Sequence, residues 1–212
     1  MSHRYELIFM ELKDRIIEIA FEQFALNGIK SVTMDEIARH IGISKRTLYE
    51  HFKDKETLVR DCMALCSKVG AEQRMQAMQR ADNILELFFS FIENVSVYFR
   101  SFNRNFFRDL KRYHSKVYTD YEATQSENVK DMIEMLRLGI EQGYIRQDIN
   151  PELAMLLLRS QFDFLWFSDL PVAKNFTIVE TVETMIVVFI RGISTEKGLK
   201  LIDDYQAKKI NI

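Results

Sequence analysis

The chain is poor in the residues that interrupt regular secondary structure, with 7 glycines and 2 prolines among 212 residues. A many-stranded sheet needs turn residues at short intervals, so this scarcity favours long helices over a sheet. No segment alternates convincingly between polar and apolar residues, as a half-buried strand would. The sequence therefore predicts an all-α fold of about nine to ten helices.

The chain also has few cysteines and a small net charge. Cys62 and Cys66 are too few for a disulfide framework, and a reducing cytoplasm is the expected location. They lie four residues apart on one helix face, where inert packing is favoured and a redox pair is the alternative. The net charge of −2 excludes a globally basic surface. Any nucleic-acid binding must therefore use a local patch.

Long apolar runs and enzyme motifs are missing. Arg159 and Asp163 interrupt one apolar stretch, and the segment 7–10 is too short for a signal peptide, so we expect no membrane partner. There is no phosphate-cradling glycine loop, nucleophile elbow or HExxH motif. His3, His40 and His114 show no metal-binding spacing. We expect no catalytic residues, no metal and no cofactor.

One segment does carry a specific pattern, the residues 33–58, which read TMDEIARHIGISKRTLYEHFKDKETL. Thr33 and Glu36 fit a capping box that begins a short helix, Gly42 permits a turn, and Ser44 can cap a second short helix. The apolar residues of both helices can pack together with Phe24 of the preceding helix. This is the construction of a helix-turn-helix, whose second helix enters the major groove of DNA.

The second helix of this motif carries polar side chains at its amino-terminal end. Lys45 and Arg46 can read guanine edges there, and Thr47 can contact a thymine methyl group or a phosphate. Tyr49 can donate its hydroxyl to a phosphate oxygen. For each basic residue taken alone, a merely solvated surface is the alternative.

The segment resembles the DNA-binding domain of the TetR/AcrR family of bacterial transcriptional regulators, over about residues 12–60. The matching positions are Ala20, Phe24, Gly28, Thr33, Ile37-Ala38, Gly42, Ser44, Leu48-Tyr49, His51-Phe52, Lys55-Glu56 and Leu58. The resemblance implies phosphate contacts at Thr33, Tyr49 and Lys55. It implies base reading by Lys45, Arg46, Thr47 and His51. Ser44, at the same helix end, is also predicted to belong to the DNA-binding surface. Many members have a small residue or proline where this chain has Arg46, which changes the expected base preference.

The resemblance also implies two domains, a DNA-binding domain in residues 1–57 and a helical ligand-binding and dimerisation domain in residues 58–212. Four aromatic residues of the second domain are predicted to line a ligand pocket, with plain core packing as the alternative: Tyr98, Phe102, Phe162 and Trp166. Gln161 or Asp163 would provide a polar anchor. The last two long helices resemble those with which the family forms dimers. A homodimer would place two recognition helices about 34–36 Å apart, in successive major grooves.

The implied function is that of a transcriptional regulator that binds a near-palindromic operator in double-stranded DNA. We expect a repressor that a small, partly apolar effector releases from the operator. The alternative is a DNA-binding structural or division-control protein of the same fold with no small-molecule ligand. A cavity among the helices of the second domain would favour a sensor, and a closed core the alternative.

Overall fold

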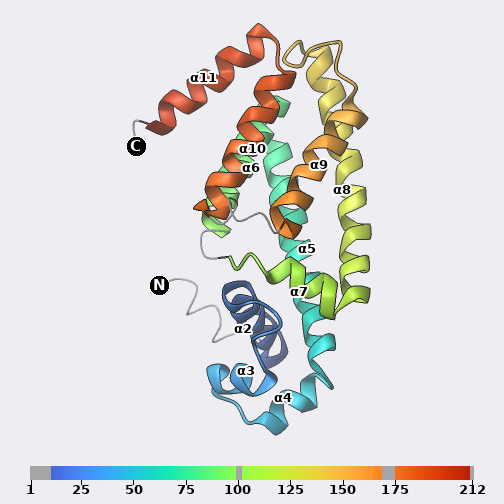
Figure 1. The fold of residues 1–212 in the computed structure, drawn as a ribbon, viewed down its shortest axis with the longest axis vertical. Helices are drawn as coiled ribbons and strands as arrows, with labels where there is room; N and C mark the ends of the chain where they lie inside the picture. Colours follow the sequence, from blue (N-terminus) through green and yellow to red (C-terminus); the bar gives the residue numbers. More distant parts are fainter. Residues whose placement is uncertain (1–10, 99–101, 169–174, 211–212) are drawn as a thin grey trace. The chain divides into compact units, whose positions relative to one another are not determined.

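The computed structural model describes residues 11–98, 102–168 and 175–210, which form ten helices (Figure 1). They are α2 (Leu12–Asn27), α3 (Met34–Ile41), α4 (Lys45–His51), α5 (Lys55–Arg80), α6 (Ile84–Tyr98), α7 (Phe106–Tyr113), α8 (Ser115–Glu141), α9 (Pro151–Phe167), α10 (Ile178–Ile193) and α11 (Glu196–Ile210). The only β-type pairing within these ranges is an isolated bridge between Ile145 and Ser194. The predicted all-α fold is confirmed.

The chain divides into two compact units. Met1–Ala71 and Ser101–Thr124 form one unit, here called the head, and Glu72–Arg100 and Gln125–Ile212 form the other, the body. Helices α5 and α8 each contribute residues to both. The functional boundary predicted after residue 57 stays a prediction. Within the described ranges, no helix is long and apolar enough to cross a membrane.

The core of the head joins α2, α3 and α4. Phe24 of α2, Ile37 of α3 and Leu48 of α4 are almost completely shielded from solvent, as is Phe52 at the end of α4. Gly42 makes the turn between α3 and α4 with φ +80° and ψ 30°, a left-handed conformation that glycine adopts without a steric penalty. The apolar spacing of the sequence thus produces the predicted three-helix arrangement.

Side-chain caps begin several helices where the sequence predicts them. Thr33 and Glu36 form the predicted capping box of α3, and these bonds from Thr33 hold the pKa of the Glu36 carboxyl below its usual value. Asn150 caps α9 ahead of Pro151. At α6, Asn83 rather than Asp82 accepts from the first helical amides, with its side-chain oxygen 3.0 Å from the amide nitrogen of Leu85.

The core of the body is built mainly by α6 and α10. Phe88 of α6 meets Phe189 of α10 edge to face, with ring centroids 5.7 Å apart. Phe89 of α6 stacks on Tyr205 of α11 at 3.9 Å. Burying such large rings contributes more to the stability of a helical bundle than burying smaller apolar side chains.

Candidate DNA-binding site

The amino-terminal turn of α4 is ordered by its own hydroxyl groups. The Ser44 side chain accepts from the Thr47 amide at 3.0 Å, and the hydroxyls of these two residues lie 2.8 Å apart. The predicted cap at Ser44 is confirmed. Because both hydroxyls are already paired, their local role is to fix the turn from which the neighbouring basic side chains project.

Lys45 and Arg46 extend from this turn into solvent, each beside a carboxylate of the head. Lys45 Nζ lies 2.8 Å from an Asp35 oxygen, and the hydrogen bond to Asp35 raises the pKa of the lysine. Arg46 Nε lies 3.0 Å from Glu50 Oε1, with 89% of the arginine side chain exposed. Exposed ion pairs contribute only about 0–1 kcal/mol to stability. Replacing these carboxylate partners with DNA phosphates therefore costs little free energy.

Tyr49 and His51 complete the exposed polar surface of α4. The Tyr49 residue is 42% exposed, and its ring lies 6.0 Å from Lys45 Nζ. Together with Lys45 and Arg46, these residues present donors and an aromatic face from one short helix. Such a surface suits base edges and phosphates.

Lys55 is placed differently from the other predicted contacts. Its ammonium group is half-buried at the start of α5 and donates to the carbonyl oxygens of Ile29 and Val32, in the loop between α2 and α3. Burial lowers the pKa of Lys55, which the charges of Asp109 and Glu36 partly offset. Lys55 therefore ties α5 to the loop that precedes Thr33, and its predicted phosphate contact stays a prediction.

Thr33 is exposed, but its side chain is occupied by the capping box. Its hydroxyl accepts from the Glu36 amide at 3.2 Å and donates to the Glu36 carboxylate at 2.8 Å. A phosphate at this position would compete with the Glu36 carboxylate for the hydroxyl proton.

Sequence reasoning missed two residues that hold the head together, Asn103 and Asp109. The backbone amide of Asn103 donates to the carbonyl oxygen of Ala25 at 2.6 Å, at the carboxyl end of α2. The Asp109 carboxylate accepts from the backbone amide of Lys30 at 2.8 Å. Lys30 and Asp109 are 79 residues apart in sequence, so no local pattern could indicate this contact. The segment around α7 thus supports the loop that leads into the helix-turn-helix.

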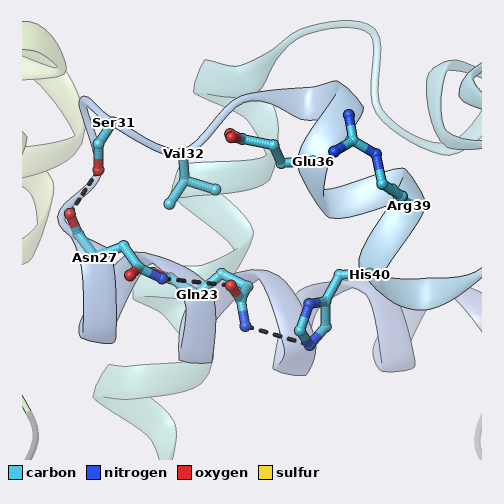
Figure 2. Close-up of a pocket in the computed structure, with 7 residues that line it drawn as sticks. All are labelled: Gln23, Asn27, Ser31, Val32, Glu36, Arg39 and His40. Carbon is cyan, nitrogen blue, oxygen red and sulfur yellow. Dashed lines mark hydrogen bonds between the residues drawn. The ribbon is translucent and has the colours of Figure 1, made fainter.

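A polar hollow lies on the head between α2 and α3 (Figure 2). Gln23 bridges it, with its amide nitrogen 3.4 Å from His40 Nε2. The lining is formed by Gln23, Asn27, Ser31, Val32, Glu36, Arg39 and His40. Its mostly polar, exposed walls do not resemble the apolar cavity that was predicted for an effector.

The four residues predicted to line the effector pocket fall in different parts of the structure. Phe102 belongs to the head, where its ring lies 4.9 Å from that of Phe106. Phe162 belongs to the body and meets Phe91 edge to face at 6.0 Å. Trp166 lies half-buried on the same helix, α9. Tyr98 ends α6, but its side chain lies outside the described residues. The pocket stays a prediction.

The two cysteines are shielded thiols on α5. Burial raises the pKa of Cys66 to about 11 and raises that of Cys62 well above its ordinary value. Cys62 Sγ also donates to the carbonyl oxygen of Ile17 at 3.4 Å. Because the thiolate is the reactive form, this environment favours inert packing over a redox role.

Comparison with known proteins agrees with this geometry. Residues 16–62 match the family model described as bacterial regulatory proteins, tetR family. These residues include the whole of α3 and α4 and the start of α5.

Three relatives match longer stretches. An uncharacterized HTH-type transcriptional regulator, YvaF of Bacillus subtilis (strain 168), is 26% identical over 189 residues, covering 86% of this chain and 96% of that protein. The HTH-type transcriptional regulator QacR of Staphylococcus aureus (strain Mu50 / ATCC 700699) is 31% identical over 121 residues, covering 57% and 61%. The HTH-type transcriptional repressor KstR2 of Mycolicibacterium smegmatis is 26% identical, covering 74% and 77%.

A solved structure is similar in fold over most of the chain. AibR, in complex with isovaleryl coenzyme A and operator DNA, superposes with a TM-score of 0.60 at 20% identity, covering 84% of this chain and 97% of that one. The fold and the exposed basic turn of α4 define a helix-turn-helix DNA-binding regulator. Over residues 16–62 the chain is similar to the TetR family of bacterial transcriptional regulators, and relatives that match longer stretches are themselves named transcriptional regulators.

Proposed function

We propose that this regulator is a homodimeric repressor that binds a near-palindromic operator and leaves it when a small, partly apolar effector binds the body. The observation that carries the DNA-binding part is the amino-terminal turn of α4, where Lys45 and Arg46 project from a helix end fixed by Ser44. In this proposal Lys45, Arg46, Thr47 and His51 read base edges. Thr33, Tyr49 and Lys55 hold phosphates.

An exposed apolar face on α9 supports dimerisation. Leu156 and Leu157 are 60% and 57% exposed, and Leu153 and Phe164 lie on the same side at helical spacing. Val188 of α10 is 63% exposed. Large apolar side chains clustered on two neighbouring helices favour burial against another protein surface. A second copy of the chain fits, because a two-fold dimer brings two α4 helices to the two halves of a palindrome.

Repression and release by an effector rest on the relatives. One relative is named a transcriptional repressor, and AibR was solved with isovaleryl coenzyme A as well as operator DNA. An effector that prefers one arrangement of the dimer over another by about 1–3 kcal/mol would change operator affinity by roughly 5- to 150-fold. Helices α5 and α8 contribute to both units and are the elements through which we expect the change to pass. We propose no enzymatic activity, and we propose a location in the bacterial cytoplasm, where the DNA is.

The test is fluorescence anisotropy on the duplex immediately upstream of the protein's own coding region, with a scrambled duplex as control and a series of salt concentrations. We expect tight, salt-sensitive binding that prefers the upstream duplex. Arg46→Ala should change the preference between the two duplexes, whereas Tyr49→Phe should weaken binding to both alike. Equal binding of wild type to both duplexes would contradict repression of its own promoter, and no binding at any salt concentration would contradict DNA binding itself.

The effector is tested on protein purified from its natural host. Native mass spectrometry should reveal a carried small molecule, and adding the extracted compound to the protein–DNA complex should lower the anisotropy. Protein that carries no compound, and a metabolite extract that releases no DNA, would favour the alternative of a DNA-binding protein without a ligand.

A further inference from the structure

A second group of basic residues lies in the head, outside the helix-turn-helix. The segment 102–118 contains five basic residues, Arg104, Arg108, Lys111, Arg112 and Lys116, and one acidic residue, Asp109, so that its net charge is +4 in a chain of net charge −2. The single acidic side chain is engaged by the backbone amide of Lys30. The segment is thus a local concentration of positive charge, of the kind that an overall acidic protein needs for an anionic partner.

Two cations lie near one aromatic ring of this segment, that of Tyr113. Lys30 Nζ lies 5.3 Å from the centroid of the Tyr113 ring, and the Arg112 guanidinium carbon lies 5.5 Å from it. Tyr113 is 42% exposed. The face of a tyrosine ring attracts a cation, and here two like charges lie near the same exposed ring. Their mutual repulsion would be relieved by an anion.

These two cations differ from those of the helix-turn-helix. Lys45 and Arg46 each have a carboxylate partner, Asp35 and Glu50. Neither Lys30 nor Arg112 forms a salt bridge with any residue that the structure describes. An incoming anion therefore has no carboxylate of the described residues to displace from Lys30 or Arg112.

The pair is also firmly joined to the DNA-binding elements. Asp109 accepts from the backbone amide of Lys30, and Lys55 donates to the carbonyl oxygens of Ile29 and Val32 on either side. Thr33, three residues after Lys30, caps α3. All of these residues belong to the head, so Lys30 and Arg112 lie in the same compact unit as α4.

We propose that Lys30, Tyr113 and Arg112 form a second phosphate-binding contact, which holds the DNA backbone flanking the segment that α4 reads. The contact rests on the DNA binding proposed above and extends it to a surface outside the helix-turn-helix. Lys30 and Arg112 donate to phosphate oxygens, and the Tyr113 ring keeps both cations in place. The contact adds affinity and salt dependence but no base preference.

The test compares wild type with Lys30→Gln, Arg112→Gln and the double variant, by anisotropy on the upstream duplex with long flanks at 50–200 mM salt. Each phosphate contact contributes about 0.9 to the slope of log affinity against log salt. Over this fourfold salt range, each lost contact should reduce the fall in affinity about threefold, and the double variant should reduce it about tenfold. The preference for the upstream duplex over the scrambled one should not change.

A charge-matched control removes the same two charges from the body, as Lys130→Gln with Lys200→Gln, both at exposed positions. This control should keep the wild-type slope. Trimming the flanks from the duplex should lower the wild-type slope to that of the Lys30/Arg112 double variant and leave the variant unchanged. Circular dichroism with thermal melting checks that every variant folds.

The proposal is overturned if the double variant keeps the wild-type slope on the long duplex, or loses no more than the charge-matched control. Failure of wild type to bind any duplex is a different result, because it would contradict the DNA binding on which this contact rests.

Discussion

The basic residues of α4 are held by carboxylates of the head before DNA arrives. Arg46 pairs with Glu50 one turn further along the same helix, and Lys45 pairs with Asp35 of α3. Both pairs are exposed, so water screens them and they stabilise the fold only slightly. Their main consequence is for binding, because each carboxylate also repels the phosphate backbone when DNA approaches.

We therefore expect the Glu50→Gln variant to bind both the upstream and the scrambled duplex more tightly than wild type. The gain in affinity should be up to about fivefold, which corresponds to the ~0.2–1 kcal/mol that an exposed ion pair contributes. The number of phosphates that are contacted does not change, so the salt slope should stay close to that of wild type. Anisotropy titrations measure both quantities. Glu134→Gln, which removes an exposed partner of Arg137 on α8, is the control and should leave affinity unchanged. Unchanged or weaker binding by the Glu50 variant would show that Glu50 does not compete with DNA.

At the scale of elements, two glycines fix how the helices of the head follow one another. Gly42 ends α3 with φ +80° and ψ 30°, and a Cβ added there would meet nothing within 4 Å. Gly28 ends α2 with φ 85° and ψ 147°, a region that is open almost only to glycine. A Cβ at Gly28 would also lie 3.2 Å from the Asp109 carboxylate. Gly28 therefore combines a more restricted backbone region with a steric conflict, whereas Gly42 has only the left-handed backbone conformation.

Gly28→Ala should lower the free energy of unfolding by about 1–3 kcal/mol, because it combines a strained backbone with pressure on the Asp109 contact. Gly42→Ala should cost about 1–2 kcal/mol, from the left-handed backbone conformation alone. Urea unfolding followed by circular dichroism compares the two variants. Equal losses would contradict the additional strain that we expect at Gly28.

At the scale of the whole molecule, the proposed function depends on linking two heads in a dimer. One α4 can contact only one half of a palindrome, and joining two halves through a dimer raises affinity by about 10²- to 10⁴-fold without any new contact to DNA. The exposed leucines of α9 are the part of the described surface that we assign to this linkage.

Replacing Leu156 and Leu157 together with glutamate should convert the proposed dimer to a monomer, because four charges would face one another across a two-fold interface. Sedimentation velocity at micromolar concentration measures the change, and operator affinity should fall by at least tenfold. Met75→Glu is the control, since Met75 of α5 is 62% exposed and lies on another helix. A double variant that sediments like wild type would place the interface elsewhere.

Much of the head could be predicted from the sequence because its signals are local. The capping box of Thr33 and Glu36, the turn at Gly42 and the cap at Ser44 involve residues no more than three or four apart, and the structure confirms each of them. Apolar spacing likewise predicted the burial of Ile37, Leu48 and Phe52. The cap of α6 is less well determined by the sequence, because Asp82 and Asn83 are neighbours of similar chemistry and only Asn83 accepts from the Leu85 amide.

The sequence by itself determined the all-α fold, the helix-turn-helix and the exposed basic turn of α4, because helix periodicity and capping act over a few residues. Only the tertiary structure decided that Lys55 donates to the carbonyl oxygens of Ile29 and Val32, and that Tyr113 gathers Lys30 and Arg112. The contacts of Lys55 with Ile29 and Val32, and that of Tyr113 with Lys30, join residues separated by 23 to 83 positions. Such pairs arise from the packing of whole helices, which spacing along the chain does not encode.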